Sequence, residues 1–144
     1  MRRRALLQAF ALAPLLAASA ELLAMPAQRV LRLGAPKATP RRVFAAGPPA
    51  AVLIAAVAPD RLLGWPMKVS PDALAQLPAS LRTLPVVGRL AGRSSTVSLE
   101  RLLSMQPDLV LDAGDFDANY RDGAERVWKQ TAIPFELIAG RLPD

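Results

Sequence analysis

Cysteine and histidine are both absent from the 144-residue chain. Without cysteine there is no disulfide framework, no thiol nucleophile and no lipid-modified cysteine. Without histidine the chain lacks the commonest transition-metal ligand and the usual general base at neutral pH. The glycine-rich nucleotide loops and the nucleophile elbow of hydrolases are missing as well. We therefore expect a protein that is not an enzyme, with no catalytic residue, no metal site and no cofactor.

Aromatic residues and blocks of basic residues are also scarce. The formal charge of +6 includes the three arginines of residues 2–4, and residues 1–20 contain no acid, so the rest of the chain carries +3. The remaining basic residues are scattered, and the pair Arg41 and Arg42 is not interleaved with aromatic residues. This pattern argues against nucleic-acid binding. An anionic small ligand is compatible with it.

Residues 1–20 have the layout of an export signal. MRRR is followed by the apolar segment ALLQAFALAPLLA and by a small-x-small site that ends at Ala20. A membrane anchor is the alternative, but the run is shorter than the ~20 residues that a span needs and is interrupted by Gln8 and Pro14. We expect cleavage near Ala20 and a periplasmic product. The twin-arginine and general secretion routes both remain open.

Apolar runs alternate with helical patterns from residue 41 onward, and residues 21–40 form an N-terminal extension and connector. This alternation predicts one three-layer α/β/α domain over residues 41–144, with a mostly parallel five-stranded sheet. Residues 29–33 are a candidate for a small additional leading strand. The five expected strands are residues 43–46, 62–65, 85–88, 109–112 and 134–138.

The stretch SLERLLSMQPDLVL, residues 98–111, predicts a short helix followed at once by a strand. Ser98 is a good N-cap, and Glu100 lies where the helix dipole favours a negative charge. Pro107 lacks the N–H that would continue the helix. The consecutive apolar residues 109–111 are typical of a parallel strand that is covered on both faces.

Three stretches together resemble the N-terminal lobe of ABC-transporter periplasmic substrate-binding proteins of the iron-siderophore, haem and cobalamin type. These stretches are RRVFAAGPPAAVLIAAVAPDRLLGW, LPVVGR and SLERLLSMQPDLVL. The resemblance implies a monomer with two α/β lobes, joined by a long helix, that delivers a metal chelate to an ABC permease in the inner membrane. A ferric siderophore is the favoured ligand, with cobalamin or haem as alternatives.

The chain reaches residue 144 about where that helix is expected, so we interpret it as a fragment whose second lobe is absent. The alternative is a single-lobe interaction protein that docks on a permease or sensor without holding a ligand.

Ligands of such sheets bind at the carboxyl ends of the strands, which directs attention to the loops there. Trp65 is the last residue of the second expected strand, where this family often presents an aromatic side chain to a flat ligand; packing within its own lobe is the alternative. Haem binders of the family carry a tyrosine ligand in the next loop. That loop has none here, and Met67 is a weaker candidate ligand.

Cationic and hydroxyl side chains follow the third and fifth expected strands. Arg89, Arg93 and Arg141 could pair with carboxylate or catecholate oxygens of a chelate, and Ser94 adds a donor. The alternative for each of them is a solvated loop residue.

Acidic residues cluster around Gly114 after the fourth expected strand. Asp112, Asp115 and Asp117 could suggest a hard cation or an acid/base pair, but their spacing matches no calcium loop, and ordinary loop chemistry is favoured. We retain Asp115 as a candidate ligand contact. Tyr120 is expected to pack under the sheet, but it lies near enough to this loop to be retained as well.

Overall fold

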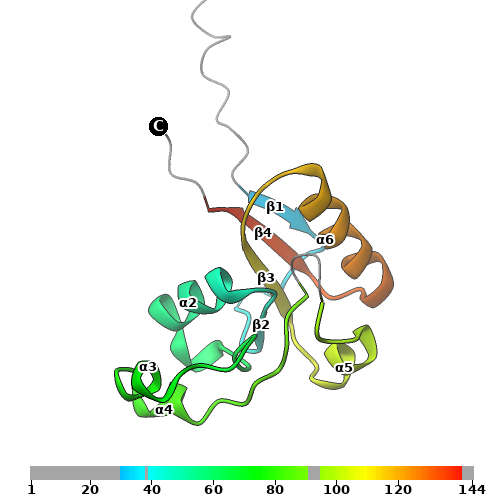
Figure 1. Ribbon diagram of the computed structural model, residues 1–144. Coiled ribbons are helices and arrows are strands. Elements are labelled where there is room, and N and C mark those ends of the chain that lie inside the picture. The colour runs from blue at the N-terminus through cyan, green and yellow to red at the C-terminus, as the bar shows by residue number, and fades with distance from the viewer. Residues whose placement is uncertain (1–29, 38, 91–94, 141–144) are drawn as a thin grey trace, which may run out of the picture.

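The computed structural model describes residues 30–37, 39–90 and 95–140 (Figure 1). The export signal expected at residues 1–20 lies outside these residues, as do the candidates Arg93, Ser94 and Arg141. Within the described part, no helix is both long and apolar enough to cross a membrane.

A four-stranded, mostly parallel sheet forms the centre of the fold, in the order β1-β4-β3-β2. Strands β2, β3 and β4 are parallel, and β1 pairs antiparallel with β4 at one edge. The expected leading strand at residues 29–33 is therefore confirmed as β1. The strands are β1 (Val30–Leu33), β2 (Val43–Ala45), β3 (Leu109–Gly114) and β4 (Phe135–Ala139).

Helices cover both faces of the sheet and give the expected three layers (Figure 1). Helix α2 (Pro48–Val57) packs on β2 and β3, and α6 (Ala118–Thr131) packs on β4 and β1. Helix α5 (Leu99–Ser104) contacts α6. The short element η2 (Pro59–Arg61) comes directly before the second expected strand, and α3 (Pro71–Ala75) and α4 (Ala79–Arg82) lie between the second and third expected strands.

The prediction of five strands is wrong, because two expected strands are reduced to isolated parallel bridges. Residues 62–65 and 85–88 pair only where Val43 meets Leu62 and where Trp65 meets Val86. Pro66 directly follows one bridge residue and Pro85 precedes another. Because proline donates no backbone N–H, neither segment extends into a regular ladder.

The helix-to-strand transition at residues 98–111 forms as predicted. The Ser98 hydroxyl accepts a hydrogen bond from the Arg101 N–H, with 3.2 Å between the two heavy atoms. Helix α5 ends at Ser104, before Pro107. The first four residues of β3 are buried, which confirms a strand covered on both faces.

The side chain of Asp108 fastens the start of β2 beside the start of β3. Its two carboxylate oxygens accept hydrogen bonds from the Arg41 and Arg42 N–H groups, both at 2.9 Å. The Asp108 N–H in turn donates to the Arg42 carbonyl oxygen at 3.0 Å. The Arg42 guanidinium donates to the carbonyl oxygens of Met105 and Gln106, at the end of α5. Strand β2 is thereby joined to both α5 and β3.

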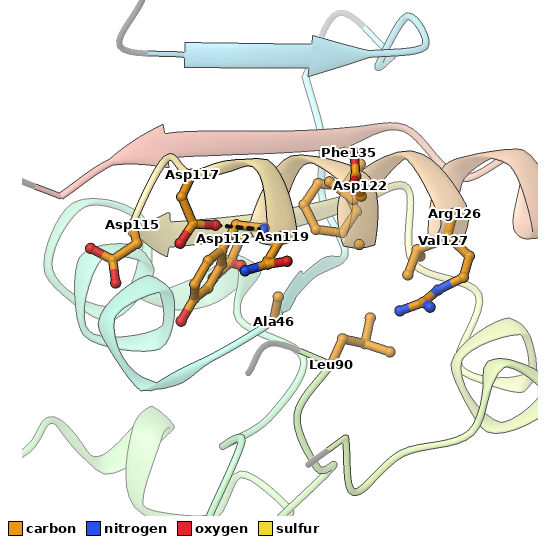
Figure 2. Close-up of a pocket in the computed structure, with 13 residues that line it drawn as sticks. Ala46, Leu90, Asp112, Asp115, Asp117, Asn119, Asp122, Arg126, Val127 and Phe135 are labelled. Atoms are coloured by element: carbon orange, nitrogen blue, oxygen red, sulfur yellow. Dashed lines mark hydrogen bonds between the residues drawn. The ribbon is translucent and has the colours of Figure 1, made fainter. Parts of the chain in front are cut away.

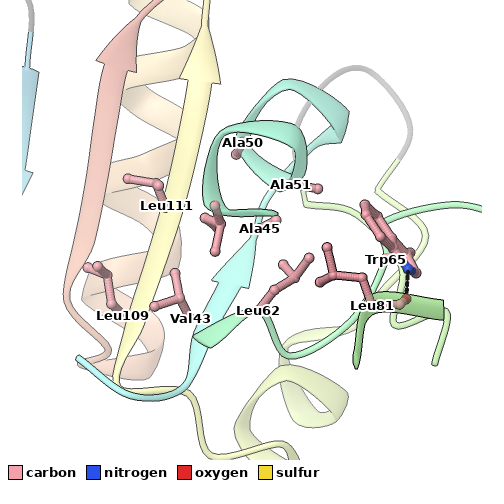
Figure 3. Close-up of a cluster of buried hydrophobic side chains, with 10 residues drawn as sticks. Val43, Ala45, Ala50, Ala51, Leu62, Trp65, Leu81, Leu109 and Leu111 are labelled. Atoms are coloured by element: carbon pink, nitrogen blue, oxygen red, sulfur yellow. Dashed lines mark hydrogen bonds between the residues drawn. The ribbon is translucent and has the colours of Figure 1, made fainter. Parts of the chain in front are cut away.

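Alternate residues of the strands point into two separate apolar cores. Leu109 and Leu111 belong to the core under α2, which Figure 3 shows together with Val43 and Ala45. Val110 belongs to the core under α6 and α5. Because strand side chains alternate with a period of two residues, the position of a residue along the strand decides which face of the sheet it points to.

Removing the Asp108 carboxylate tests its role at the start of the sheet. We expect Asp108→Ala to lower the free energy of unfolding by about 3 kcal/mol, because two backbone N–H groups lose a charged acceptor. The matched control is Asp60→Ala at an exposed position of η2, which should change stability by less than about 0.5 kcal/mol. Urea unfolding followed by circular dichroism measures both. Equal losses in the two variants would contradict the assigned role.

Two glycine-to-alanine substitutions test how closely residues 62–65 pack against residues 85–88. A Cβ on Gly64 would lie 2.5 Å from the Pro85 carbonyl oxygen and 2.6 Å from Cγ1 of Val87, whereas a Cβ on Gly123 would meet nothing within 4 Å. Gly64→Ala should therefore lower the free energy of unfolding by about 2 kcal/mol. Gly123→Ala, inside α6, should raise it by about 0.5 to 1 kcal/mol. If the urea midpoints of both variants moved in the same direction, the close packing around Gly64 would be contradicted.

Candidate functional site

A cleft of about 700 Å³ lies along α6, between residues 119–127 of that helix and a part of the sheet that includes Ala46 after β2, Asp112 of β3 and Phe135 at the start of β4; we call it the α6 cleft. Its apolar lining includes Ala46, Leu90, Val127 and Phe135. Its polar lining is formed by Asp112, Asp115, Asp117, Asn119, Tyr120, Asp122 and Arg126 (Figure 2). The cleft therefore combines an apolar surface with a set of carboxylates.

A second cleft of similar volume, about 700 Å³, lies beside the two bridge segments; we call it the Met67 cleft. It is lined by Met67, Arg89 and Arg101, together with residues 86–88 and 96–98 and Pro66. The Arg89 N–H donates to the Thr96 hydroxyl at 3.0 Å, and the Thr96 N–H donates back to the Arg89 carbonyl at 2.9 Å. These bonds hold residues 89 and 96 together.

The structure divides the sequence candidates between these two clefts. Asp115 and Tyr120 line the α6 cleft, and Met67 and Arg89 line the Met67 cleft. Trp65 lines neither cleft.

The structure places Trp65 in the core instead of at a rim. Its side chain is only 7% exposed and belongs to the core under α2. Its indole Nε1 donates to the Leu81 carbonyl oxygen at 3.0 Å (Figure 3). The hydrogen bond satisfies the only polar atom of the ring, as burial requires. Of the two interpretations of this residue, the geometry agrees with packing within its own lobe.

Asp112 is the buried polar residue of the described chain and the least expected member of the α6 cleft. It follows Val110 by two positions on β3, so the strand directs it to the α6 side of the sheet. It is 5% exposed. Burial raises the pKa of Asp112 from 3.8 to about 6, and the hydrogen bond from the Ala113 N–H opposes this rise only in part.

The two oxygens of Asp112 have different surroundings. Oδ1 accepts the Ala113 N–H at 2.9 Å, while Oδ2 accepts no hydrogen bond from the described residues. Because no fully buried side-chain oxygen lacks a partner in that part of the chain, Oδ2 must reach the surface. Asp112 is also one of the residues that line the α6 cleft.

Asp117 has a structural role as well as a place in the lining. It is the N-cap of α6, and its Oδ1 accepts the Tyr120 N–H at 3.1 Å. Its Oδ1 therefore has an ordinary structural role as a helix cap, as the sequence favoured. Among the residues that the structure describes, no three acids lie close enough to hold a metal ion.

Sequence reasoning missed the importance of Asp112 and did not consider Arg126. Asp112 was grouped with the loop acids that follow it, although it is still within β3. A single carboxylate directly after three apolar strand residues was a usable signal, because the period of two assigns it to the face of Val110. Arg126 had no such signal, since an exposed arginine on a helix is ordinary.

Comparisons with known proteins give one informative likeness. No family model matches the sequence, and no curated protein matches it. The structure is similar to an ABC transporter solute binding protein from Sulfurospirillum deleyianum DSM 6946, with a TM-score of 0.58 and 18% sequence identity. The match covers 72% of this chain and 32% of that chain, so this chain corresponds to about a third of that protein. At this identity the likeness shows that the two share an α/β lobe fold.

The raised pKa of Asp112 predicts a pH-dependent stability. Between pH 3.8 and about 6 the unfolded chain loses this proton while the folded chain keeps it, so the free energy of unfolding falls as pH rises. Above pH 6 the whole difference, about 2 to 3 kcal/mol, is expressed. Asp112→Asn keeps an acceptor for the Ala113 N–H and removes the charge. The free energy of unfolding of this variant should match that of the parent near pH 3.5 and exceed it by about 2 to 3 kcal/mol at pH 7.5.

Urea unfolding at closely spaced pH values, with each variant compared with the parent, measures this difference. Asp60→Asn is the control and should show no such trend. A stability difference between Asp112→Asn and the parent that stays constant from pH 3.5 to 7.5 would contradict the assignment.

Proposed function

We propose that this chain is the N-terminal lobe of an exported solute-binding component of an ABC importer, and that it binds a metal chelate. A ferric siderophore is the favoured ligand, with cobalamin or haem as alternatives. The observation that carries the proposal is the α6 cleft, whose lining includes Ala46 and Asp112 near the carboxyl ends of the parallel strands β2 and β3, where α/β sheets bind ligands. The shared fold with a solute binding protein supports it.

The proposal assigns a role to each part of the chain. Residues 1–20 are an export signal that is cleaved near Ala20, residues 21–40 are a connector, and residues 41–144 are the lobe. A second α/β lobe would form the other wall of the binding site. The similar protein leaves room for such a lobe, because about two thirds of its length lies outside the match. The product is a periplasmic monomer that delivers its ligand to a permease in the inner membrane, without catalysis.

A second candidate is a single-lobe interaction protein that docks on a permease or sensor and holds no ligand. The observation in its favour is helix α2, which contains no charged or polar side chain. Val52 and Val57 on its outer face are 66% and 73% exposed. A helix that is apolar all round is normally buried, so this face suits contact with another protein.

Calorimetric titration of the chain with ferric hydroxamate and catecholate siderophores, haemin and cyanocobalamin tests the first candidate. We expect one of these chelates to bind with a dissociation constant of about 100 μM, because one wall buries less of a ligand than a closed cleft does. Tyr120→Ala should weaken this binding about tenfold, since the ring lines the α6 cleft.

The matched control is Leu103→Ala, which removes an exposed apolar side chain of α5 outside both clefts. It should bind the chelate as the parent does. Absence of binding to every chelate would overturn the first candidate and leave the second. Equal effects of the two substitutions would show that the chelate binds elsewhere.

A further inference from the structure

The two faces of the sheet are covered unevenly. Helix α2 packs on β2 and β3, whereas α6 packs on β4 and β1 from the opposite face (Figure 1). Among the described helices, α6 is the one that packs closely on β4 and β1. The α2 side of these two strands is therefore left without a covering helix in that part of the chain, although both faces of a mostly parallel sheet are normally covered.

The strand register identifies the side chains on this uncovered side. Ala113 is the partner of Ile138 in the ladder between β3 and β4, and Ile138 is the partner of Val30 in the ladder between β4 and β1. Paired residues point to the same face of a sheet, so all three side chains lie on the α2 side. All three are only partly buried, and Ala113 and Ile138 pack at the margin of the core under α2. An ion pair at 3.2 Å between Arg32 and Glu136 borders them.

One side of α2 extends this apolar surface. Figure 3 shows Ala51 on the side of α2 that faces Trp65, away from β4. Leu53 is two residues further along the helix and points nearly the opposite way, and Val57 lies on the same side as Leu53 because it follows four residues later. Leu53 packs on the same core as Ile138, and Val57 is 73% exposed. We give the name bare face to the surface formed by Val30, Leu53, Val57, Ala113 and Ile138.

The chain itself provides an apolar segment beside the bare face. Residues 21–29, ELLAMPAQR, lie outside the described residues and lead directly into β1 at Val30, which belongs to the bare face. Four consecutive residues of this segment, 22–25, are apolar. Pro26 has no N–H to donate, so the segment is poorly suited to continue β1 as a regular strand.

The length of the segment matches the distance that it would have to cover. Residues 21–29 span up to about 30 Å when extended. Neighbouring strands lie about 4.8 Å apart, so the path from β1 across β4 and β3 to α2 is about 15 Å. The segment can therefore reach the side of α2 that carries Leu53 and Val57.

We propose that residues 21–29 fold back over the bare face and pack Leu22 and Leu23 against the side of α2 that carries Leu53 and Val57. The packing removes two apolar surfaces from water at once. It also keeps copies of the chain from associating through this face, since an exposed apolar patch beside a sheet edge favours association. The covering segment is independent of the ligand proposed for the α6 cleft.

The absence of cysteine makes a single introduced thiol a specific probe of this covering. Ile138→Cys in the full chain places a thiol on the bare face, and Leu103→Cys is the control at an exposed position of α5 on the other side of the sheet. Adding Leu22→Asp and Leu23→Asp should speed alkylation of Cys introduced at position 138 by N-ethylmaleimide about tenfold, because the thiol becomes accessible. The control thiol should react equally fast in both backgrounds. If Ile138→Cys fails to fold by circular dichroism, Ala113→Cys replaces it.

A matched pair on α2 tests where the segment packs. Val57→Asp puts a charge on the side of α2 that faces β4 and should speed alkylation of the Ile138→Cys chain about threefold, since an apolar segment packs poorly against a charge. Val52→Asp puts the same charge on another side of the helix, at a position that is 66% exposed, and should leave the rate unchanged. Equal effects of the two substitutions would overturn the placement beside α2.

The remaining outcomes separate the possible occupants of the bare face. An alkylation rate of the Ile138→Cys chain that does not respond to Leu22→Asp and Leu23→Asp would overturn the proposal. Protection of the thiol that increases with protein concentration, together with a dimer in sedimentation, would identify a second copy as the occupant and would also overturn it. A monomer whose thiol is released by the two aspartates, at a rate independent of concentration, would confirm it.

Discussion

The Asp108 carboxylate is the contact on which the arrangement of the sheet depends. It binds the two backbone N–H groups that lead into β2, one residue before β3 begins. This fixes the register in which Val43 lies beside Leu109. A slip of one residue would exchange the two faces of the strand, because side chains alternate with a period of two. Both apolar cores and the α6 cleft depend on the same register.

This register also fixes the position of Asp112. Four residues after Asp108, the alternation places its carboxylate on the face that α6 covers, at the carboxyl end of the strand. There it is desolvated by burial, which raises its pKa to about 6. Above a pH of about 6 the fold therefore holds a charge at a desolvated position, which lowers the free energy of unfolding.

Local chemistry made several elements predictable from the sequence. Ser98 and Pro107 mark the start and the end of a helix through a hydroxyl acceptor and a missing N–H, and both act within a few residues. The strand at residues 109–112 was predictable because three apolar residues in a row indicate burial on both faces. The bridges at residues 62–65 and 85–88 look equally apolar, but their pairing depends on prolines in two separate segments. Trp65 was ambiguous for a similar reason, since its partner, the Leu81 carbonyl, lies 16 residues away.

The sequence by itself determined the α/β class, the mostly parallel order of the strands and the loops at their carboxyl ends. Periodicity, caps and prolines act over a few residues, so they can be read along the chain. Only the tertiary structure decided the number of strands, the burial of Trp65 and the meeting of Asp112 with the start of α6. These features depend on contacts between distant segments, and desolvation of a carboxylate is a property of everything that surrounds it.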